Sequence, residues 1–282
     1  MASIIQLAKV NPPECLNDFA LQPTSRHRLE SVIDQTLAFP QHGVCGLLMY
    51  GTYGTGKTTL ARLLPGIIET ARMTNVLKTC LAGEVTDAIN TYYDFHACAS
   101  GQNSTGLIQS VQSKTSFIST NSSGLHFVIL DELDNLTALA QASFKALMNS
   151  THVVYLMTTN NLSDIDRGIQ DRSVLIDMDV PPPKYWRPIL KRVYKDAGLS
   201  PPPDHLLDQS VTAARGSARS IFSDVVMTAN QKIRNGERRT AANDALGMGT
   251  PNQGSQAPTP SETAKPSSSE KARDDLNPGS ET

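Results

Sequence analysis

The stretch that decides the fold is GTYGTGKT, residues 51–58, which matches the pattern Gly-x-x-x-x-Gly-Lys-[Ser/Thr] in full. The apolar run 44–50 precedes it, and a helical pattern begins at Thr59. The glycines allow the backbone to wrap closely, so that its N–H groups point at phosphate oxygens, and the following helix N-terminus adds partial positive charge. We expect Lys57 to reach the β- and γ-phosphates of a nucleotide and Thr58 to place its hydroxyl on Mg²⁺. The predicted nucleotide-binding residues are therefore Gly51, Thr52, Tyr53, Gly54, Thr55, Gly56, Lys57, Thr58 and Thr59.

A second motif is the apolar run His126–Leu130, which ends in two carboxylates, Asp131 and Glu132. Ligands of parallel sheets bind at the carboxyl ends of strands. If this strand lies beside the phosphate-loop strand, Asp131 comes near the Mg²⁺, and Glu132 is placed to align the attacking water or to take its proton. The alternative is that the two acids only cap the next helix, which is the role we expect for Asp134. The position about seventy residues after the phosphate loop favours the metal site.

Short, continuous apolar runs alternate with helical patterns through the first two thirds of the chain. Such runs suit strands that are covered on both faces, as in a parallel sheet with crossover helices. The sequence therefore predicts an α/β fold: a P-loop nucleoside-triphosphatase domain with a five-stranded parallel sheet and helices on both faces. Pro65 lies inside the first helical pattern after the phosphate loop, and we expect it to kink or end that helix. The predicted strands are 44–50, 92–98, 127–130, 153–157 and 174–178.

The remainder of the chain divides into a helical unit and a low-complexity segment. Proline runs at 181–183 and 201–203 precede two helical patterns, and Ser217 has the properties of an N-cap for a third helix that ends before Gly236. From about residue 249 onward, Gly, Pro, Ser and Thr dominate, which predicts a disordered tail with a passive, solubilising role rather than a partner-binding one. The predicted organisation is an N-terminal segment (1–15), a nucleotide-binding α/β domain (16–180), a small all-helical lid (181–238) and a disordered tail (239–282).

Composition excludes several classes of protein. Lys and Arg number 25 against 27 Asp and Glu, a net charge of −2, so bulk charge cannot hold nucleic acid and any such contact needs a local patch. No apolar stretch is long enough to cross a membrane, and the N-terminus lacks the layout of a signal peptide. The 4 cysteines are scattered, which argues against a zinc site or a disulfide framework. We expect a cytoplasmic protein of a bacterial cell or of a virus-infected host cell.

Together the two motifs resemble those of the AAA+ ATPases, and within them the clamp-loader subunits. The segment VVYLMTTNN, residues 153–161, is similar to the first sensor strand of that family. The resemblance implies that Asn160 contacts the attacking water or the γ-phosphate. A turn residue that merely ends the strand is the alternative interpretation.

Two arginines are assigned by the same resemblance. Asp171-Arg172-Ser173 resembles the clamp-loader Ser-Arg-Cys segment, although only the arginine matches. Arg172 would then reach the nucleotide of a neighbouring subunit and stabilise charge on the transferred phosphoryl group, with Arg167 as the competing candidate. The segment 214–219 is similar to the second sensor, so that Arg219 would touch the γ-phosphate in the same subunit, with Arg215 as the alternative.

The resemblance implies ATP and Mg²⁺ as cofactors, hydrolysis to ADP and phosphate, and a homo- or hetero-oligomeric ring or spiral. The first functional hypothesis is a clamp-loader-like subunit in DNA replication, with DNA and a sliding clamp or another replication protein as partners. Clamp-loader subunits continue into a helical collar domain, whereas here low-complexity sequence follows the predicted lid. The second hypothesis is therefore a DNA-associated regulator or scaffold that recruits a helicase or a transposase. A protein-remodelling ATPase is the third hypothesis, and this sequence shows no convincing pore-loop motif to support it.

Overall fold

The computed structural model describes residues 7–74, 91–99 and 104–236. Its strands form one five-stranded sheet with the order β2-β3-β4-β1-β5, and every neighbouring pair is parallel. All five predicted strands are confirmed, with ends that differ by one or two residues. The predicted tail at 239–282 lies outside the described residues. The strands are β1 (Gly46–Tyr50), β2 (Asp94–Ala97), β3 (His126–Asp131), β4 (Val153–Thr159) and β5 (Ser173–Asp177).

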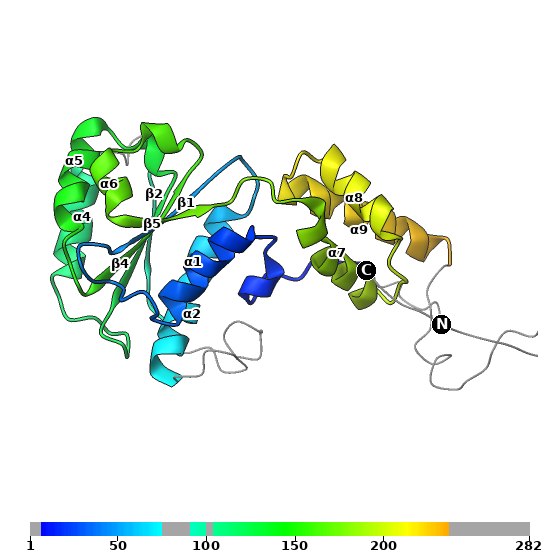
Figure 1. Ribbon diagram of the computed structural model, residues 1–282, viewed down its shortest axis with the longest axis horizontal. Helices are drawn as coiled ribbons and strands as arrows, with labels where there is room; N and C mark the ends of the chain where they lie inside the picture. The colour runs from blue at the N-terminus through cyan, green and yellow to red at the C-terminus, as the bar shows by residue number, and fades with distance from the viewer. Residues whose placement is uncertain (1–6, 75–90, 100–103, 237–282) are drawn as a thin grey trace, which may run out of the picture. The chain divides into compact units, whose positions relative to one another are not determined.

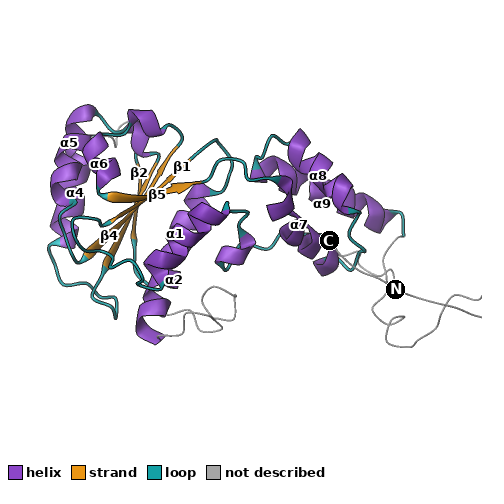
Figure 2. Ribbon diagram, in the orientation of Figure 1, coloured by secondary structure: helices purple, strands orange, loops and turns teal. Residues whose placement is uncertain are grey.

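Helices cover both faces of the sheet, as predicted (Figures 1 and 2). One face packs against α1 (Pro23–Ile33) and α2 (Lys57–Thr74). The other packs against α4 (Thr105–Thr115), α5 (Ala138–Leu147) and α6 (Arg167–Asp171). Alternate residues of β1, β3, β4 and β5 enter the two cores, which explains why the central strands are apolar without interruption. In β4, all seven residues are buried.

The strand order corrects one assumption of the sequence analysis. The acidic strand β3 does not lie beside the phosphate-loop strand β1, because β4 lies between them. The carboxyl ends of all three strands nevertheless reach the same edge of the sheet, since the strands are parallel. Residues at the end of β4 therefore lie between the phosphate loop and the acidic pair.

Pro65 does not end α2, which runs through it from Lys57 to Thr74. A proline inside a helix costs about 3 kcal/mol relative to alanine, because it removes one hydrogen bond. Leu60 and Leu64 before it, and Ile67 and Ile68 after it, are buried against the sheet. Burial of four aliphatic side chains contributes roughly 6–12 kcal/mol, which outweighs that cost. Of the two outcomes expected at Pro65, a kink or an end of the helix, the end is therefore wrong.

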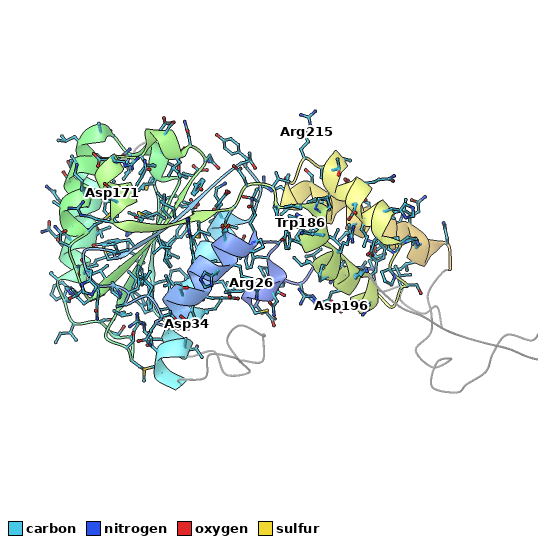
Figure 3. All side chains as sticks on the ribbon, in the orientation of Figure 1. Arg26, Asp34, Asp171, Trp186, Asp196 and Arg215 are labelled. Atoms are coloured by element: carbon cyan, nitrogen blue, oxygen red, sulfur yellow. The ribbon has the colours of Figure 1, made fainter. Side chains whose placement is uncertain are left out.

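A helical module (Pro183–Arg234) follows the sheet, and its helices share a separate core. The Ser217 hydroxyl caps the third helix by accepting the Ser220 N–H, as predicted. Trp186 is buried in this module and meets Phe222 edge to face at a centroid distance of 6.0 Å (Figure 3). The boundaries at 16, 181 and 239 stay predictions. The elements of the module are η4 (Pro183–Tyr185), α7 (Arg187–Asp196), α8 (Asp204–Ala213) and α9 (Ala218–Arg234).

Candidate functional site

The predicted phosphate loop is the turn between β1, which ends at Tyr50, and α2, which begins at Lys57. Its first glycine, Gly51, has φ +138°, a conformation that residues with a side chain rarely adopt. A Cβ at Gly51 would also lie 2.7 Å from the Asp179 backbone nitrogen and 2.8 Å from the Met178 carbonyl carbon. Glycine is therefore required at this position by backbone conformation and by the close approach of a second chain segment.

Lys57 lies under this loop and is only 7% exposed. Its Nζ donates to the carbonyl oxygens of Gly51 at 2.8 Å and Thr52 at 2.7 Å. Burial lowers the pKa of Lys57, while neighbouring carboxylates, led by Asp179 and Asp134, act in the opposite direction. Bound phosphates would favour the charged ammonium in the same way as these carboxylates.

Asp131 and Thr58 meet at the edge of the sheet, although 73 positions separate them in the sequence. Thr58 Oγ1 donates to Asp131 Oδ1 at 2.7 Å. A hydroxyl and a carboxylate are hard oxygen donors of the kind that Mg²⁺ prefers, and Mg²⁺ usually takes few protein ligands besides substrate phosphates and water. The pair therefore fits the predicted ion. No cluster of three or more His, Cys, Asp or Glu suited to a metal is found among the described residues.

Thr158, near the end of β4, joins the two acidic residues, and the sequence analysis missed it. Its Oγ1 donates to Asp131 Oδ1 at 2.6 Å and accepts the Glu132 backbone N–H at 2.9 Å. Glu132 itself adopts a left-handed conformation, with φ 58° and ψ 55°, which is costly for a residue with a side chain. Thr158 therefore holds both Asp131, the predicted Mg²⁺ ligand, and the strained turn that presents Glu132. The only signal in the sequence is a polar end to an otherwise apolar strand.

Asp134 does not cap a helix, so this prediction is wrong. Its Oδ1 accepts a hydrogen bond from Thr159 Oγ1 at 3.0 Å. The N-cap of α5 is instead Thr137, whose side chain accepts the Ala140 N–H at 3.2 Å. The preference of acids for helix starts is outweighed here by a buried hydroxyl that the neighbouring strand β4 supplies.

Lys57, Thr58, Glu132 and Thr158 line a cavity of about 810 Å³, a volume within the usual range for small-molecule sites. From the sheet it is lined by the predicted nucleotide-binding residues Tyr53–Thr59, together with Glu132, Thr158 and Asn160. Gly51, Thr52 and Asp131 are not among its lining residues. The helical module supplies Trp186, Ile189, Arg192, Val193, Asp196, Ala218, Arg219 and Phe222. The predicted loop, water-aligning carboxylate and both sensor residues thus converge on one space.

The N-terminal segment also lines this cavity, which the sequence analysis did not anticipate. Residues 9–14 take part, and Asp18 fixes their end by accepting the backbone N–H groups of Glu14 at 2.7 Å and Cys15 at 3.1 Å. Asp18 also forms an ion pair with Arg192 of α7, and the Ala8 N–H donates to Asn230 of α9 at 2.6 Å. Burial raises the pKa of Asp18, but the hydrogen bonds from Glu14 and Cys15 and the charge of Arg192 outweigh it, and the net shift is downward.

The AAA family, ATPases associated with various cellular activities, matches residues 47–179. This segment begins in β1 and ends just beyond β5, and it includes the phosphate loop, Asp131, Glu132 and Asn160. Residues 47–179 have the P-loop fold of AAA+ domains.

Two kinds of relative support the fold of this AAA domain. The large subunit of replication factor C from Methanosarcina mazei is 25% identical over 190 residues, which cover 66% of this chain and 27% of that protein. The chain thus spans little more than a quarter of this curated relative. The Thermotoga maritima RuvB Holliday junction branch migration motor superposes with a TM-score of 0.59 at 14% identity, covering 84% of this chain and 71% of that one. The AAA domain of FIGL-1 in complex with ADP has a TM-score of 0.54 at 15% identity, covering 86% and 80%.

Arg172 does not line the cavity of its own AAA domain. It lies immediately before β5, where its backbone carbonyl accepts N–H groups at the start of β1, at the opposite end of that strand from the phosphate loop. Its side chain donates to the Gly168 carbonyl at 2.9 Å and to Asn149 Oδ1 at 3.3 Å. The competing Arg167 is more exposed, with 85% of its side chain accessible, and pairs with Asp171.

The two candidates for the second sensor differ in position. Arg219 lies in the first turn of α9 and lines the cavity. Arg215 has φ 50°, projects away from the helical module (Figure 3), and is not a lining residue of this cavity. The geometry therefore favours Arg219, whose role stays a prediction.

Within the described part of the chain, no helix combines the length and apolar character required of a membrane span.

Replacing Thr158 by valine tests its place in the AAA domain. Valine keeps the shape but leaves Asp131 without one donor and the Glu132 N–H without an acceptor, so we expect the ATP turnover rate to fall about tenfold or more. Thr158→Ser keeps the hydroxyl and is the matched control, with turnover close to that of the unmodified chain. Equal turnover of the valine and serine variants, both folded by circular dichroism, would contradict this role.

Proposed function

We propose that this chain hydrolyses ATP to ADP and phosphate in a Mg²⁺-dependent reaction at the cavity described above. The observation that carries the proposal is the 2.7 Å contact between Thr58 and Asp131 beside the buried ammonium of Lys57. Lys57 and Thr58 line the cavity, and the Asp131 carboxylate lies within hydrogen-bond distance of Thr58. Such a combination suits a triphosphate with its metal ion.

Each residue has a distinct part in this proposal. Lys57 would exchange the two loop carbonyls for phosphate oxygens, and the loop N–H groups would bind the same phosphates. Thr58 and Asp131 would hold Mg²⁺, which supplies charge neutralisation when bound. Glu132, exposed at the cavity, would orient the attacking water and accept its proton, while Asn160 contacts that water or the γ-phosphate.

We further propose that the active form is an oligomer in which Arg172 completes the site of a neighbouring subunit. Along β1, the phosphate loop and the backbone next to Arg172 are separated by a five-residue strand, a span of roughly 16 Å. A residue at that end of the sheet is poorly placed to serve its own cavity, which supports action on another subunit. The neighbour's Arg172 would stabilise charge on the transferred phosphoryl group.

The cellular role that we propose is assembly of a protein on DNA, as in a clamp-loader-like subunit. The replication-factor-C relative and the RuvB fold support a DNA-related role, and clamp loading is the finer hypothesis. A DNA-bound scaffold that recruits a helicase or transposase is the second candidate. A protein-remodelling ATPase is the third and has no specific observation in its favour.

The proposed role is tested by the ATPase rate with single-stranded, duplex and primed DNA, with molecular mass measured in each nucleotide state. Stimulation by primed DNA together with a sliding clamp is the result expected for a clamp loader. Filaments on DNA with a non-hydrolysable ATP analogue, without a response to a clamp, would favour the scaffold. An ATPase rate that is the same with and without every form of DNA would contradict both the clamp-loader and the scaffold roles.

A further inference from the structure

The sequence analysis did not single out Asp179, yet its carboxylate contacts the phosphate loop directly. Asp179 Oδ1 accepts the backbone N–H of Thr52 at 2.7 Å. Thr52 is the second residue of the loop, and Asp179 lies two residues beyond the end of β5, where the chain leaves the sheet. Because a carboxylate acceptor makes this hydrogen bond charge-assisted, it is stronger than a bond between neutral groups.

The backbone that carries Asp179 is itself fixed. The Asp179 N–H donates to Asp177 Oδ1 at 2.8 Å, and the Met178 N–H donates to the Tyr50 carbonyl at 2.8 Å. Residues 178–179 also lie so close to Gly51 that a Cβ there would be within 2.8 Å of their backbone atoms. The backbone of residues 178–179 is thus held by hydrogen bonds and packs directly against the start of the loop, which fixes the position of the Asp179 carboxylate.

The same loop residues are held by Lys57 from their carbonyl side. The carbonyls of Gly51 and Thr52 accept from Lys57 Nζ, while the Thr52 N–H is taken by Asp179. When phosphates attract Lys57, the Gly51 carbonyl loses this donor and the Thr52 carbonyl keeps the Thr55 hydroxyl at 3.1 Å, while the hydrogen bond to Asp179 remains available. It would then keep the first turn of the loop in place.

We propose that Asp179 is a positioning residue that holds the first turn of the phosphate loop in its phosphate-binding conformation through the Thr52 N–H. The proposal rests on the proposed function, since it presumes that the loop binds ATP. Two effects of the carboxylate oppose each other. Its hydrogen bond favours ATP binding by ordering the loop, whereas its negative charge disfavours binding by repelling phosphates.

The two effects separate in a pair of variants. Asp179→Asn retains an oxygen acceptor and removes the charge, so we expect it to bind ATP as tightly as the unmodified chain or more tightly. Asp179→Ala removes both, and we expect the Kd and the KM for ATP to rise about fivefold, with a smaller change in kcat. If charge were the only contribution, both variants would bind ATP more tightly, and that result would overturn the proposal.

Asp34→Ala is the matched control. Asp34 Oδ1 accepts the Thr36 N–H at 2.9 Å in an exposed turn after α1, so it makes the same kind of bond away from the cavity (Figure 3). We expect its ATP affinity to be unchanged. A fivefold loss in Asp34→Ala as well would attribute the effect of Asp179→Ala to general destabilisation and would overturn the proposal.

A further variant removes the donor of this hydrogen bond, the Thr52 N–H, instead of its acceptor. Thr52→Pro lacks the N–H, and adding Asp179→Ala to it should weaken ATP binding no further, because the hydrogen bond is already absent. Independent, additive losses would contradict the proposal. Calorimetric titration of the full chain with ATP and Mg²⁺ measures the Kd for ATP of every variant. Absence of binding by the unmodified chain would refute the proposed function, whereas equal ATP affinity of Asp179→Asn and Asp179→Ala would refute only the role of Asp179.

Discussion

Replacing Arg172 by alanine is expected to lower the ATP hydrolysis rate about 10³-fold or more while leaving ATP binding nearly unchanged. The affinity is preserved because Arg172 does not line the cavity of its own chain. The rate falls because the guanidinium would stabilise charge that develops on the neighbour's phosphoryl group during transfer. Steady-state hydrolysis and calorimetric titration with ATP measure the two quantities separately.

Arg167→Ala is the control for this experiment, because Arg167 is the nearby alternative and makes only an exposed ion pair. We expect it to hydrolyse ATP at close to the normal rate. A large loss in Arg167→Ala and none in Arg172→Ala would transfer the proposed role to Arg167.

A mixing experiment separates action on a neighbour from a structural role of Arg172. Arg172→Ala keeps an intact cavity, and Lys57→Ala keeps an intact Arg172. Mixed oligomers should therefore regain hydrolysis that neither variant has alone, because a Lys57→Ala subunit supplies the arginine to its neighbour. If Arg172 served only its own chain, through its bonds to Gly168 and Asn149, mixing would restore nothing.

Replacing Lys57 by alanine is expected to weaken ATP binding about 100-fold or more. The substitution removes a buried cation from the cavity, together with the hydrogen bonds that Lys57 donates to the carbonyls of Gly51 and Thr52. It also leaves Asp131, Asp134, Glu132 and Asp179 without the positive charge that offsets their repulsion of phosphates. Titration with ATP in the presence of Mg²⁺ measures the loss.

The matched control is Lys145→Ala. Lys145 forms an ion pair with Asp166, with 3.1 Å between Nζ and Oδ2, and neither residue lines the cavity. Its ATP affinity should not change. The two variants should also be compared by thermal unfolding, since Lys57 is buried and Lys145 is partly exposed. ATP affinity close to normal in a folded Lys57→Ala protein would refute the assignment of this cavity as the nucleotide site.

Interactions that the chain makes within a short segment could be predicted from the amino-acid sequence. The phosphate loop is such a case, because its glycines, its lysine and the start of α2 lie within eight positions and determine one another's conformation. The same holds for the five apolar strands and for Ser217 as a helix cap. Asp131 also contacts Thr58 of the loop although its strand is not beside the phosphate-loop strand, because parallel strands end at one edge whichever strand lies between them, and its role at Mg²⁺ stays a prediction.

Where sequence-based reasoning was wrong, a distant segment outweighed a local preference. Pro65 stays inside α2 because buried side chains on both sides of it pack on the sheet. Asp134 bonds to Thr159 instead of capping a helix, because β4 lies beside β3. Local propensities are worth about 1–3 kcal/mol each, and packing across the core exceeds that.

The chemical groups of the site can thus be identified in the linear chain, but their supports cannot. Lys57, Thr58 and Asp131 belong to motifs with recognisable spacing, whereas Thr158, Asp179 and residues 9–14 reach the site only through strand order and the path of the chain. A hydrogen bond depends on a separation of about 3 Å, and no pattern of residue types specifies that separation for segments that lie 26 to 127 positions apart, as these do. Folding of the sheet creates those contacts, since β4 comes to lie between β1 and β3 and the end of β5 against the phosphate loop.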